Sequence, residues 1–243
     1  MSGYVHPLPD GTVTIQTPRL LLRAAQASDA EALHLCFVDT EVMRYWSSRP
    51  HKSLEETKEW LAKMVNSKKT NGITDFVITL RDNAPSYLSI SQPKHVQIET
   101  GPIELSKSNI SPAIGKTGIF APLDASMSGE IGFLLNRSYQ GRGFGSEALT
   151  AVLRYLFEQK GVETITTDVD PRNGACISLL KKHGFVLTGI AKESYRIGEE
   201  WVDTKRGKVD VFHTAQLHGN RDRLPSLSVF TASTLLLRLK RPA

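Results

Sequence analysis

One run of residues, 140–145 (Gln-Gly-Arg-Gly-Phe-Gly), constrains the fold of this chain more than any other, because every second residue in it is glycine. It follows the apolar segment 131–135, which predicts a strand, and it precedes residues 146–149, which begin an apolar stripe at helical spacing. Glycine lets the backbone adopt a positive φ and approach a ligand closely. Because the N-terminus of a helix presents N–H groups without intrahelical partners, this strand–loop–helix unit predicts a phosphate-binding site.

The glycine spacing separates this loop from two common nucleotide-binding motifs. The pattern is G-x-G-x-G rather than the G-x-G-x-x-G of dinucleotide-binding folds, and no Gly-Lys-Ser/Thr follows it, as a P-loop would require. The net charge of +5 and the pI of about 9.2 suit an anionic ligand. No dense basic cluster with interleaved aromatic residues is present, so we expect no nucleic-acid partner.

Length and composition indicate an ordinary globular protein. The chain has 243 residues, of which 40% are hydrophobic and 23% charged, enough to form a core without disulfides. Its two cysteines, Cys36 and Cys176, match no metal-binding spacing, so we expect no metal and a reducing, cytoplasmic location. No stretch approaches the roughly 18 apolar residues of a membrane span, and residues 1–7 lack the features of a signal peptide, so we expect no membrane partner.

Periodicity and capping signals predict an α/β chain. Capping boxes at Ser28 and Ser53 predict helices to about residues 38 and 68, and further helices are expected at 146–160 and from Asn173 to His183. Residues 42–46 between the first two helices are expected to form a loop. The strands are expected at residues 19–23, 76–80, 114–120, 130–136, 163–170, from 185 and at 209–213. This order predicts a mixed sheet with helices on both faces.

The chain divides into one domain with three additions. We expect a leader at residues 1–15, a domain at 16–214 and a C-terminal tail at 215–243. Residues 82–112 are rich in Ser, Pro, Asn and Lys and show no period. A loop of that length is uncommon in a compact domain, so this segment is interpreted as an insertion, either a lid or a disordered loop.

Three segments resemble one enzyme family. Residues 140–145 resemble the acyl-CoA pyrophosphate loop of the GNAT acetyltransferase superfamily, and residues 168–185 resemble its asparagine-capped helix that ends in Lys-x-Gly-Phe. Residues 17–23, together with Tyr45 and Trp46, resemble the branch that contains ribosomal-protein N-acetyltransferases. The resemblance covers roughly residues 15–214. It implies a GNAT-like α+β fold with a central mixed, mostly antiparallel sheet, and acetyl-CoA as cofactor.

The resemblance also implies which residues hold the cofactor. In this family the pantetheine arm pairs with the strand before the loop, a N–H near Leu135 polarises the thioester carbonyl, and Asn173 lies near the pantetheine. Asn173 is equally interpreted as a helix cap. The expected cofactor-binding residues are Leu134, Leu135, Asn136, Gln140, Gly141, Arg142, Gly143, Phe144, Gly145, Ser146 and Asn173.

Two residues are expected to take part in proton transfer. Glu130 stands near a family carboxylate that acts as general base, although a slip of one residue would turn its side chain to the other face of the sheet. Many members carry a tyrosine where this chain has Leu180, so the leaving thiolate needs another donor. Cys176 is the candidate, with a pKa that a helix N-terminus would lower. Each of the two is alternatively structural, Glu130 as a solvated strand end and Cys176 as a small buried residue.

The acceptor is expected to be a primary amine gripped by Tyr45 and Trp46, which otherwise cap the core. Branch resemblance favours a protein or peptide N-terminal amine, and a small-molecule amine is the alternative. A catalytically degenerate CoA-binding module is a third interpretation, because the family tyrosine is missing. The oligomeric state is expected to be a monomer or a homodimer.

Overall fold

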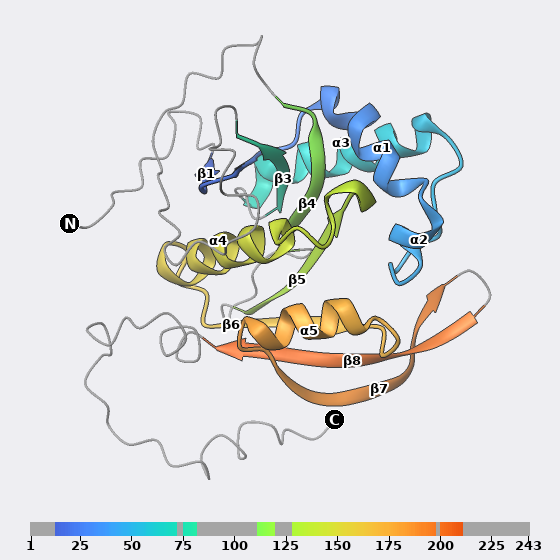
Figure 1. Cartoon of the computed structure of the whole chain (residues 1–243), viewed down its shortest axis with the longest axis vertical. Coiled ribbons are helices and arrows are strands. Elements are labelled where there is room, and N and C mark those ends of the chain that lie inside the picture. The colour runs from blue at the N-terminus through green and yellow to red at the C-terminus, as the bar shows by residue number, and fades with distance from the viewer. Residues whose placement is uncertain (1–12, 72–74, 82–110, 120–127, 198–199, 211–243) are drawn as a thin grey trace.

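The structure, a computed structural model, describes residues 13–71, 75–81, 111–119, 128–197 and 200–210 (Figure 1). The first 12 residues of the expected leader, most of the expected insertion and the expected tail lie outside the described residues. Among the described residues, no helix is long and apolar enough to cross a membrane.

One eight-stranded sheet organises the molecule. Every neighbouring pair of strands is antiparallel except β5 and β6, so the expected mixed, mostly antiparallel sheet is confirmed. In spatial order the strands are β1 (Ile15–Gln16), β2 (Leu20–Arg23), β3 (Asp75–Leu80), β4 (Ala113–Ile119), β5 (Ser128–Leu135), β6 (Thr164–Val169), β8 (Glu200–Asp210) and β7 (Val186–Ile197).

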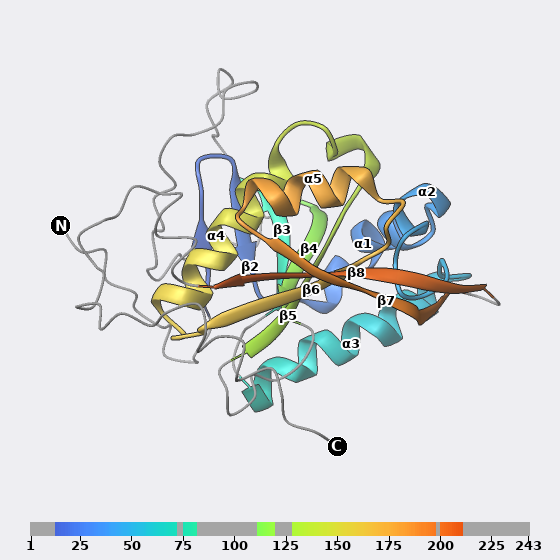
Figure 2. The same ribbon diagram turned by 90° about the horizontal axis from the view of Figure 1, so that it is seen from below.

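Helices cover both faces of this sheet, as expected (Figure 2). The helices are α1 (Ala30–Phe37), α2 (Thr40–Met43), α3 (Leu54–Asn71), α4 (Phe144–Glu158) and α5 (Gly174–Lys182), with 3-10 turns η1 (Ala27–Asp29) and η3 (Arg137–Tyr139). Strand residues alternate between two cores, as their period of two requires. Phe76 and Ile78 pack with α4 and α5, whereas Val77 packs with α1 and α3.

Two of the predicted helix caps form. The Ser53 hydroxyl accepts a hydrogen bond from the Glu56 N–H (3.3 Å), and Asn173 Oδ1 accepts one from the Cys176 N–H (3.0 Å). The predicted cap at Ser28 is wrong. Asp29 instead accepts from the Gln26 N–H (2.8 Å) and pairs with the buried guanidinium of Arg23 (2.7 Å). The chain therefore enters α1 through a 3-10 turn that is organised by this ion pair.

Three other predictions need correction. Ile15, expected in the leader, lies in β1 with no exposed surface and pairs with Leu22 of β2. Within the expected loop 42–46, the first residues complete α2, because the Asp39 carboxylate caps the Glu41 and Val42 N–H groups. Strand β8 begins at Glu200 rather than at 209. Its charged residues hide it from a search for apolar alternation, and pairing with β6 and β7 on its two edges explains why it is extended.

Candidate functional site

Strands β5 and β6 diverge in the middle of the sheet. Ser128, Gly129 and Glu130 pair with Thr164–Thr166 of β6, and the ladder with β6 ends there. From Ile131 to Leu135, β5 pairs with β4 alone. Among the described strands, the edge of β5 that faces β6 is therefore open over these last residues. Open main-chain donors and acceptors of this kind can hold an extended ligand as an additional strand.

The hydrogen-bond phase decides which β5 residues face the opening. The Asn136 N–H donates to the Ile114 carbonyl (2.8 Å), which continues the β4–β5 register. Because hydrogen-bonded pairs alternate in an antiparallel ladder, the main chain of Leu134 also faces β4, while Phe133 and Leu135 face the open edge. Of Leu134, Leu135 and Asn136, only Leu135 therefore directs its N–H toward the opening. Phe133 joins it, a residue that sequence reasoning missed because the phase is visible only once strands are paired.

The glycine loop turns the chain from β5 into α4. Gln140 closes it by donating its side-chain amide to the Leu135 carbonyl (2.9 Å). Gly141 and Gly143 adopt φ values of +71° and +80°, as the pattern predicts. Gly145 lies within α4, and a Cβ there would make an ordinary contact with Leu179 at 3.7 Å. Only two of the three glycines are thus required by backbone conformation.

The N-terminus of α4 is open to an anion. The first intrahelical bond runs from the Glu147 N–H to the Gly143 carbonyl (3.0 Å), so Phe144, Gly145 and Ser146 have no intrahelical acceptor for their N–H groups. Arg142 is exposed, and its guanidinium lies 5.2 Å from the centre of the Phe144 ring. Main-chain donors therefore gather at the start of α4, and the exposed Arg142 adds a positive charge to the same loop, a combination that suits phosphate.

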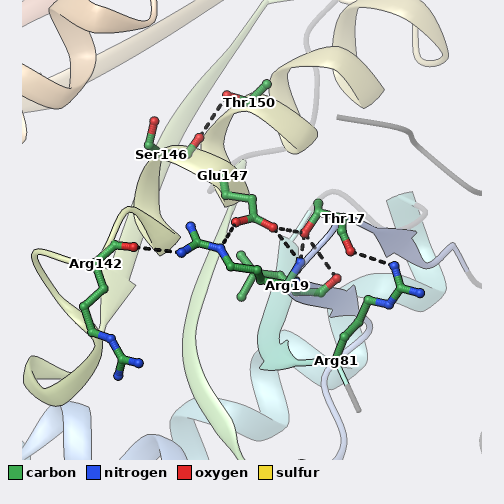
Figure 3. Close-up of polar contacts among 8 residues, drawn as sticks. Thr17, Arg19, Arg81, Arg142, Ser146, Glu147 and Thr150 are labelled. Carbon is green, nitrogen blue, oxygen red and sulfur yellow. Dashed lines mark hydrogen bonds and ion pairs between the residues drawn. The ribbon is translucent and has the colours of Figure 1, made fainter. Parts of the chain in front are cut away.

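A buried polar cluster lies beneath this loop (Figure 3). Arg19 Nε contacts Glu147 Oε2 at 2.6 Å, and the Thr17 hydroxyl donates to Glu147 Oε1. Arg19 Nη1 reaches the Arg142 carbonyl at 3.0 Å. Arg81 extends the cluster by donating a hydrogen bond to the Thr17 carbonyl at 2.9 Å. The sequence offers no local signal for this cluster, because 128 residues separate Arg19 from Glu147.

The candidate base lies on the face of the sheet that α1 and α3 cover. Glu130 is the third residue of β5, half-buried, and pairs with Thr166. Side chains alternate along a strand, so Glu130 shares its face with Leu134, which packs in the core with α1 and α3. The register therefore places the carboxylate on the α1–α3 face, where the loop that carries Trp46 also packs.

Helix α5 supplies the candidate proton donor. Asn173 caps this helix through the Cys176 N–H, so its capping role is established by geometry. Burial raises the pKa of the Cys176 thiol to about 12, which corrects the expected lowering by the helix N-terminus. The thiol therefore stays protonated at neutral pH. Leu180 is fully buried in the core and offers no hydroxyl.

The loop expected to contact the acceptor, with Tyr45 and Trp46, also contains Arg44. Arg44 follows α2 and lies over the Tyr45 ring at 5.4 Å, whereas Trp46 packs against the α1–α3 core. Burial alone would raise the pKa of the Asp170 carboxyl, but hydrogen bonds and charge from Arg172 and the charge of Arg44 outweigh burial and lower it. Asp170 is thus held as an anion by Arg172, at 2.7 Å. Arg44 remains 60% exposed.

Among the described residues, no group of three or more His, Cys, Asp or Glu side chains is placed to hold a metal ion. Cys36 is buried in the α1–α3 core, where burial raises the pKa of its thiol to about 12.

Comparison with known proteins adds sequence relatives to this geometry. The family model described as acetyltransferase (GNAT) domain matches residues 19–186. An uncharacterized N-acetyltransferase of Bacillus subtilis (strain 168), YnaD, is 26% identical over 189 residues, which cover 78% of this chain and 92% of that protein. A spermidine N(1)-acetyltransferase of Vibrio cholerae is 23% identical over 77% of this chain and 91% of its own length. The Escherichia coli (strain K12) [ribosomal protein uS5]-alanine N-acetyltransferase is 33% identical, but over only 30% of this chain and 38% of its own length.

Solved structures share the fold. A GNAT-family acetyltransferase from Bacillus anthracis superposes with a TM-score of 0.62 at 22% identity and covers 81% of this chain and 98% of its own. A spermidine N-acetyltransferase from Vibrio cholerae, in complex with CoA and spermine, superposes with a TM-score of 0.59 at 20% identity and covers 80% and 97% of the two chains.

Proposed function

This chain belongs to the GNAT acetyltransferase family and is an acetyl-CoA-dependent N-acetyltransferase, and we propose that its acceptor is the α-amino group of a protein or peptide N-terminus. The observation that supports acetyl-CoA as the donor is the open edge of β5, which leads through the glycine loop to the N-terminus of α4. The open edge of β5 offers main-chain hydrogen bonds, and the N-terminus of α4 that follows it offers N–H groups for phosphate. Acetyl-CoA has its pantetheine arm and diphosphate in that order.

We assign the donor contacts as follows. The main chain of Phe133 and Leu135 pairs with the pantetheine arm, and the N–H groups of residues 143–146 with Arg142 bind the diphosphate. The thioester carbonyl then lies within reach of the Leu135 N–H, which stabilises the oxyanion that forms when the amine attacks. Asn173, at the N-terminus of α5, is assigned to the same binding site beside the open edge of β5. The Gln140 side-chain amide donates a hydrogen bond to the Leu135 carbonyl, and its assigned role is to fix the position of the end of β5.

Proton transfer accompanies attack on the thioester. The amine must be neutral to attack, and Glu130 is assigned as the general base, acting through water because it stands well before the end of β5. The carbon–sulfur bond then breaks and the CoA thiolate leaves. Cys176 donates a hydrogen bond to that thiolate from its protonated thiol. With a thiol of such high pKa, Cys176 stabilises the leaving group rather than acting as a nucleophile.

The donors of Arg44, after α2, support a peptide as the acceptor. The exposed Arg44 lies near the Tyr45 ring, and the nearby Asp170 carboxylate is already paired with Arg172. Arg44 makes a long ion pair with the exposed Glu41 (3.7 Å), and its other N–H groups can bind a carbonyl oxygen or a carboxylate of a peptide. An α-amino group, with a pKa near 7.7–8.0, also releases its proton more readily than a lysine-like amine.

The proposal is tested by CoA release from acetyl-CoA with matched acceptors. We compare two forms of one short peptide that contains an internal lysine. The form with a free N-terminus should support turnover, and the form with an acetylated N-terminus should not. Mass spectrometry of the product should place the added acetyl group on the α-amine. Turnover with the blocked peptide but not the free one would overturn the assignment of the acceptor.

One observation favours a second acceptor class. The alignment with the spermidine acetyltransferase covers 91% of that protein, whereas the alignment with the ribosomal-protein enzyme covers 38% of its length. Spermidine therefore belongs in the same assay. A kcat/KM for spermidine above that of every free peptide would transfer the proposal to small-molecule amines. Binding of acetyl-CoA without turnover on any amine would instead identify a CoA-binding module.

A further inference from the structure

Three polar side chains from distant segments meet beneath the glycine loop, and none of them is among the donor contacts assigned above. Thr17 and Arg19 lie in the turn between β1 and β2, and Glu147 lies in the first turn of α4 (Figure 3). Only 1%, 8% and 4% of their respective surfaces are exposed. Burial of charge is costly unless every charge is paired and hydrogen-bonded, and replacement by apolar residues is often neutral for stability. Stability therefore does not by itself explain this cluster.

The Arg19 guanidinium contacts Arg142 and Phe144 and fills the space beside Gly143. Its Nη1 donates to the Arg142 carbonyl at 3.0 Å, and its Nη2 lies 3.2 Å from the position that a Cβ would occupy on Gly143. The guanidinium carbon lies 4.4 Å from the centre of the Phe144 ring. A planar guanidinium with fixed donor directions is suited to hold such a turn, in which both Gly141 and Gly143 have positive φ.

The same guanidinium neutralises a carboxylate at the helix end. Glu147 stabilises the N-terminus of α4 as an acidic first-turn residue, but an unpaired charge there would repel an anion bound to that N-terminus. Arg19 Nε holds Glu147 Oε2 at 2.6 Å, and the Arg19 N–H holds Oε1 at 2.9 Å. The Thr17 hydroxyl also donates to Oε1. Both oxygens of the carboxylate are thus hydrogen-bonded.

We propose that Arg19 is a positioning residue for the donor diphosphate. It holds the Arg142 carbonyl so that the following N–H groups converge, and it cancels the charge of Glu147 so that the N-terminus of α4 stays attractive to an anion. Arg19 acts through the loop and does not contact the donor. This inference rests on the assignment of the glycine loop to the diphosphate in the proposed function.

The test compares two acetyl donors that differ by the diphosphate. Kinetics are measured with acetyl-CoA and with S-acetylpantetheine, which lacks phosphate, for the wild type, Arg19→Lys and the double variant Arg19→Met/Glu147→Met. Lysine keeps the charge but loses the planar donors that reach the Arg142 carbonyl. The methionine pair removes both buried charges at similar volume and keeps the variant foldable. Arg154→Lys is the control, because Arg154 pairs with Glu158 on the exposed side of the same helix.

We expect both Arg19 variants to raise the KM for acetyl-CoA about tenfold or more, as loss of one charge-assisted hydrogen bond implies, with kcat within about twofold. The kcat/KM for S-acetylpantetheine should stay at the wild-type value, and Arg154→Lys should resemble the wild type with both donors. An unchanged KM for acetyl-CoA would overturn the proposal.

Other failures remain distinguishable. Equal losses with both donors, or failure of both Arg19 variants to fold, would also overturn the positioning role, because the cluster would then serve the fold alone. A wild-type protein that binds no CoA in calorimetry would instead overturn the assignment of the glycine loop.

Discussion

Gly115 on β4 leaves no space for a side chain beside Leu134 on β5, because a Cβ there would overlap the Leu134 carbonyl oxygen. The close approach occurs beside a bulge in the β3–β4 ladder, where Ile78 pairs with Gly115 and the next residue pairs with Ala113. Bulges bend a strand locally. The two strands are thus pressed together on one edge of β5 at the level where its other edge is open.

Replacement of Gly115 by alanine should therefore destabilise the protein. We expect the free energy of unfolding in urea to fall by about 3 kcal/mol, because a backbone oxygen cannot move aside as a flexible side chain would. Gly189→Ala on β7 is the matched control, since a Cβ there meets no atom within 4 Å. Equal stability of the two variants would show that β4 and β5 can separate without cost.

The glycines of the loop should respond differently to the same substitution. Gly143→Ala forces a Cβ into a φ of +80° and against Arg19, so we expect a loss of about 1–2 kcal/mol in unfolding free energy. Gly145→Ala lies in α4 with room for a Cβ and should gain up to about 1 kcal/mol from helix propensity. Urea denaturation of both variants checks the contrast, and a destabilised Gly145→Ala would contradict it.

Loss of the proposed base should depend on pH. Glu130→Gln should lower kcat/KM chiefly below about pH 8, where an α-amine is mostly protonated and must lose its proton before it attacks. At higher pH the free amine is already abundant and the two enzymes should converge. The measurement is a pH–rate profile with a free-terminus peptide. A deficit that is constant with pH would remove Glu130 as the base.

Cys176 should act only as a protonated thiol. Its pKa of about 12 predicts that it contributes no ionisation to the pH–rate profile between pH 6 and pH 10. Serine keeps a donor at the same position, so Cys176→Ser should retain activity, whereas Cys176→Ala should slow turnover about tenfold. Equal rates for the two variants would leave Cys176 with a packing role alone.

His51 should titrate below an ordinary histidine. Burial lowers the pKa of its imidazole, which stacks on Phe37 at 4.5 Å and shares the Thr57 hydroxyl with His34. Because the pKa in the folded protein lies below the ordinary histidine value of 6.5, this contribution to stability is present above pH 6.5 and is lost as the pH falls. An NMR titration of the His51 ring should give a midpoint below 6.5. A midpoint above that value would contradict the structure.

Local patterns predicted the parts of this molecule that depend on neighbouring residues. The helix that Ser53 caps, the Asn173 cap and the positive φ of Gly141 and Gly143 all follow from short-range chemistry. The predictions failed where a distant partner decides. Ser28 does not cap α1 because Asp29 pairs with Arg23, and β8 extends from Glu200 because two other strands pair with it.

The candidate site divides in the same way. Its glycine loop is visible in the sequence because consecutive residues make it. The exposure of the Leu135 N–H rather than that of Asn136 depends on the phase of the ladder with β4. Likewise, the raised pKa of Cys176 depends on atoms that pack around α5 and not on its place near a helix N-terminus.

By itself, then, the sequence determined the strand–loop–helix unit with its glycine turn, since backbone conformation at each residue is a local property. Only the tertiary structure decided that β5 and β6 diverge after Glu130, and that Arg19 and Glu147 meet beneath the loop. Those arrangements join residues far apart in the chain, and their energies come from burial and pairing that exist only after the sheet has formed.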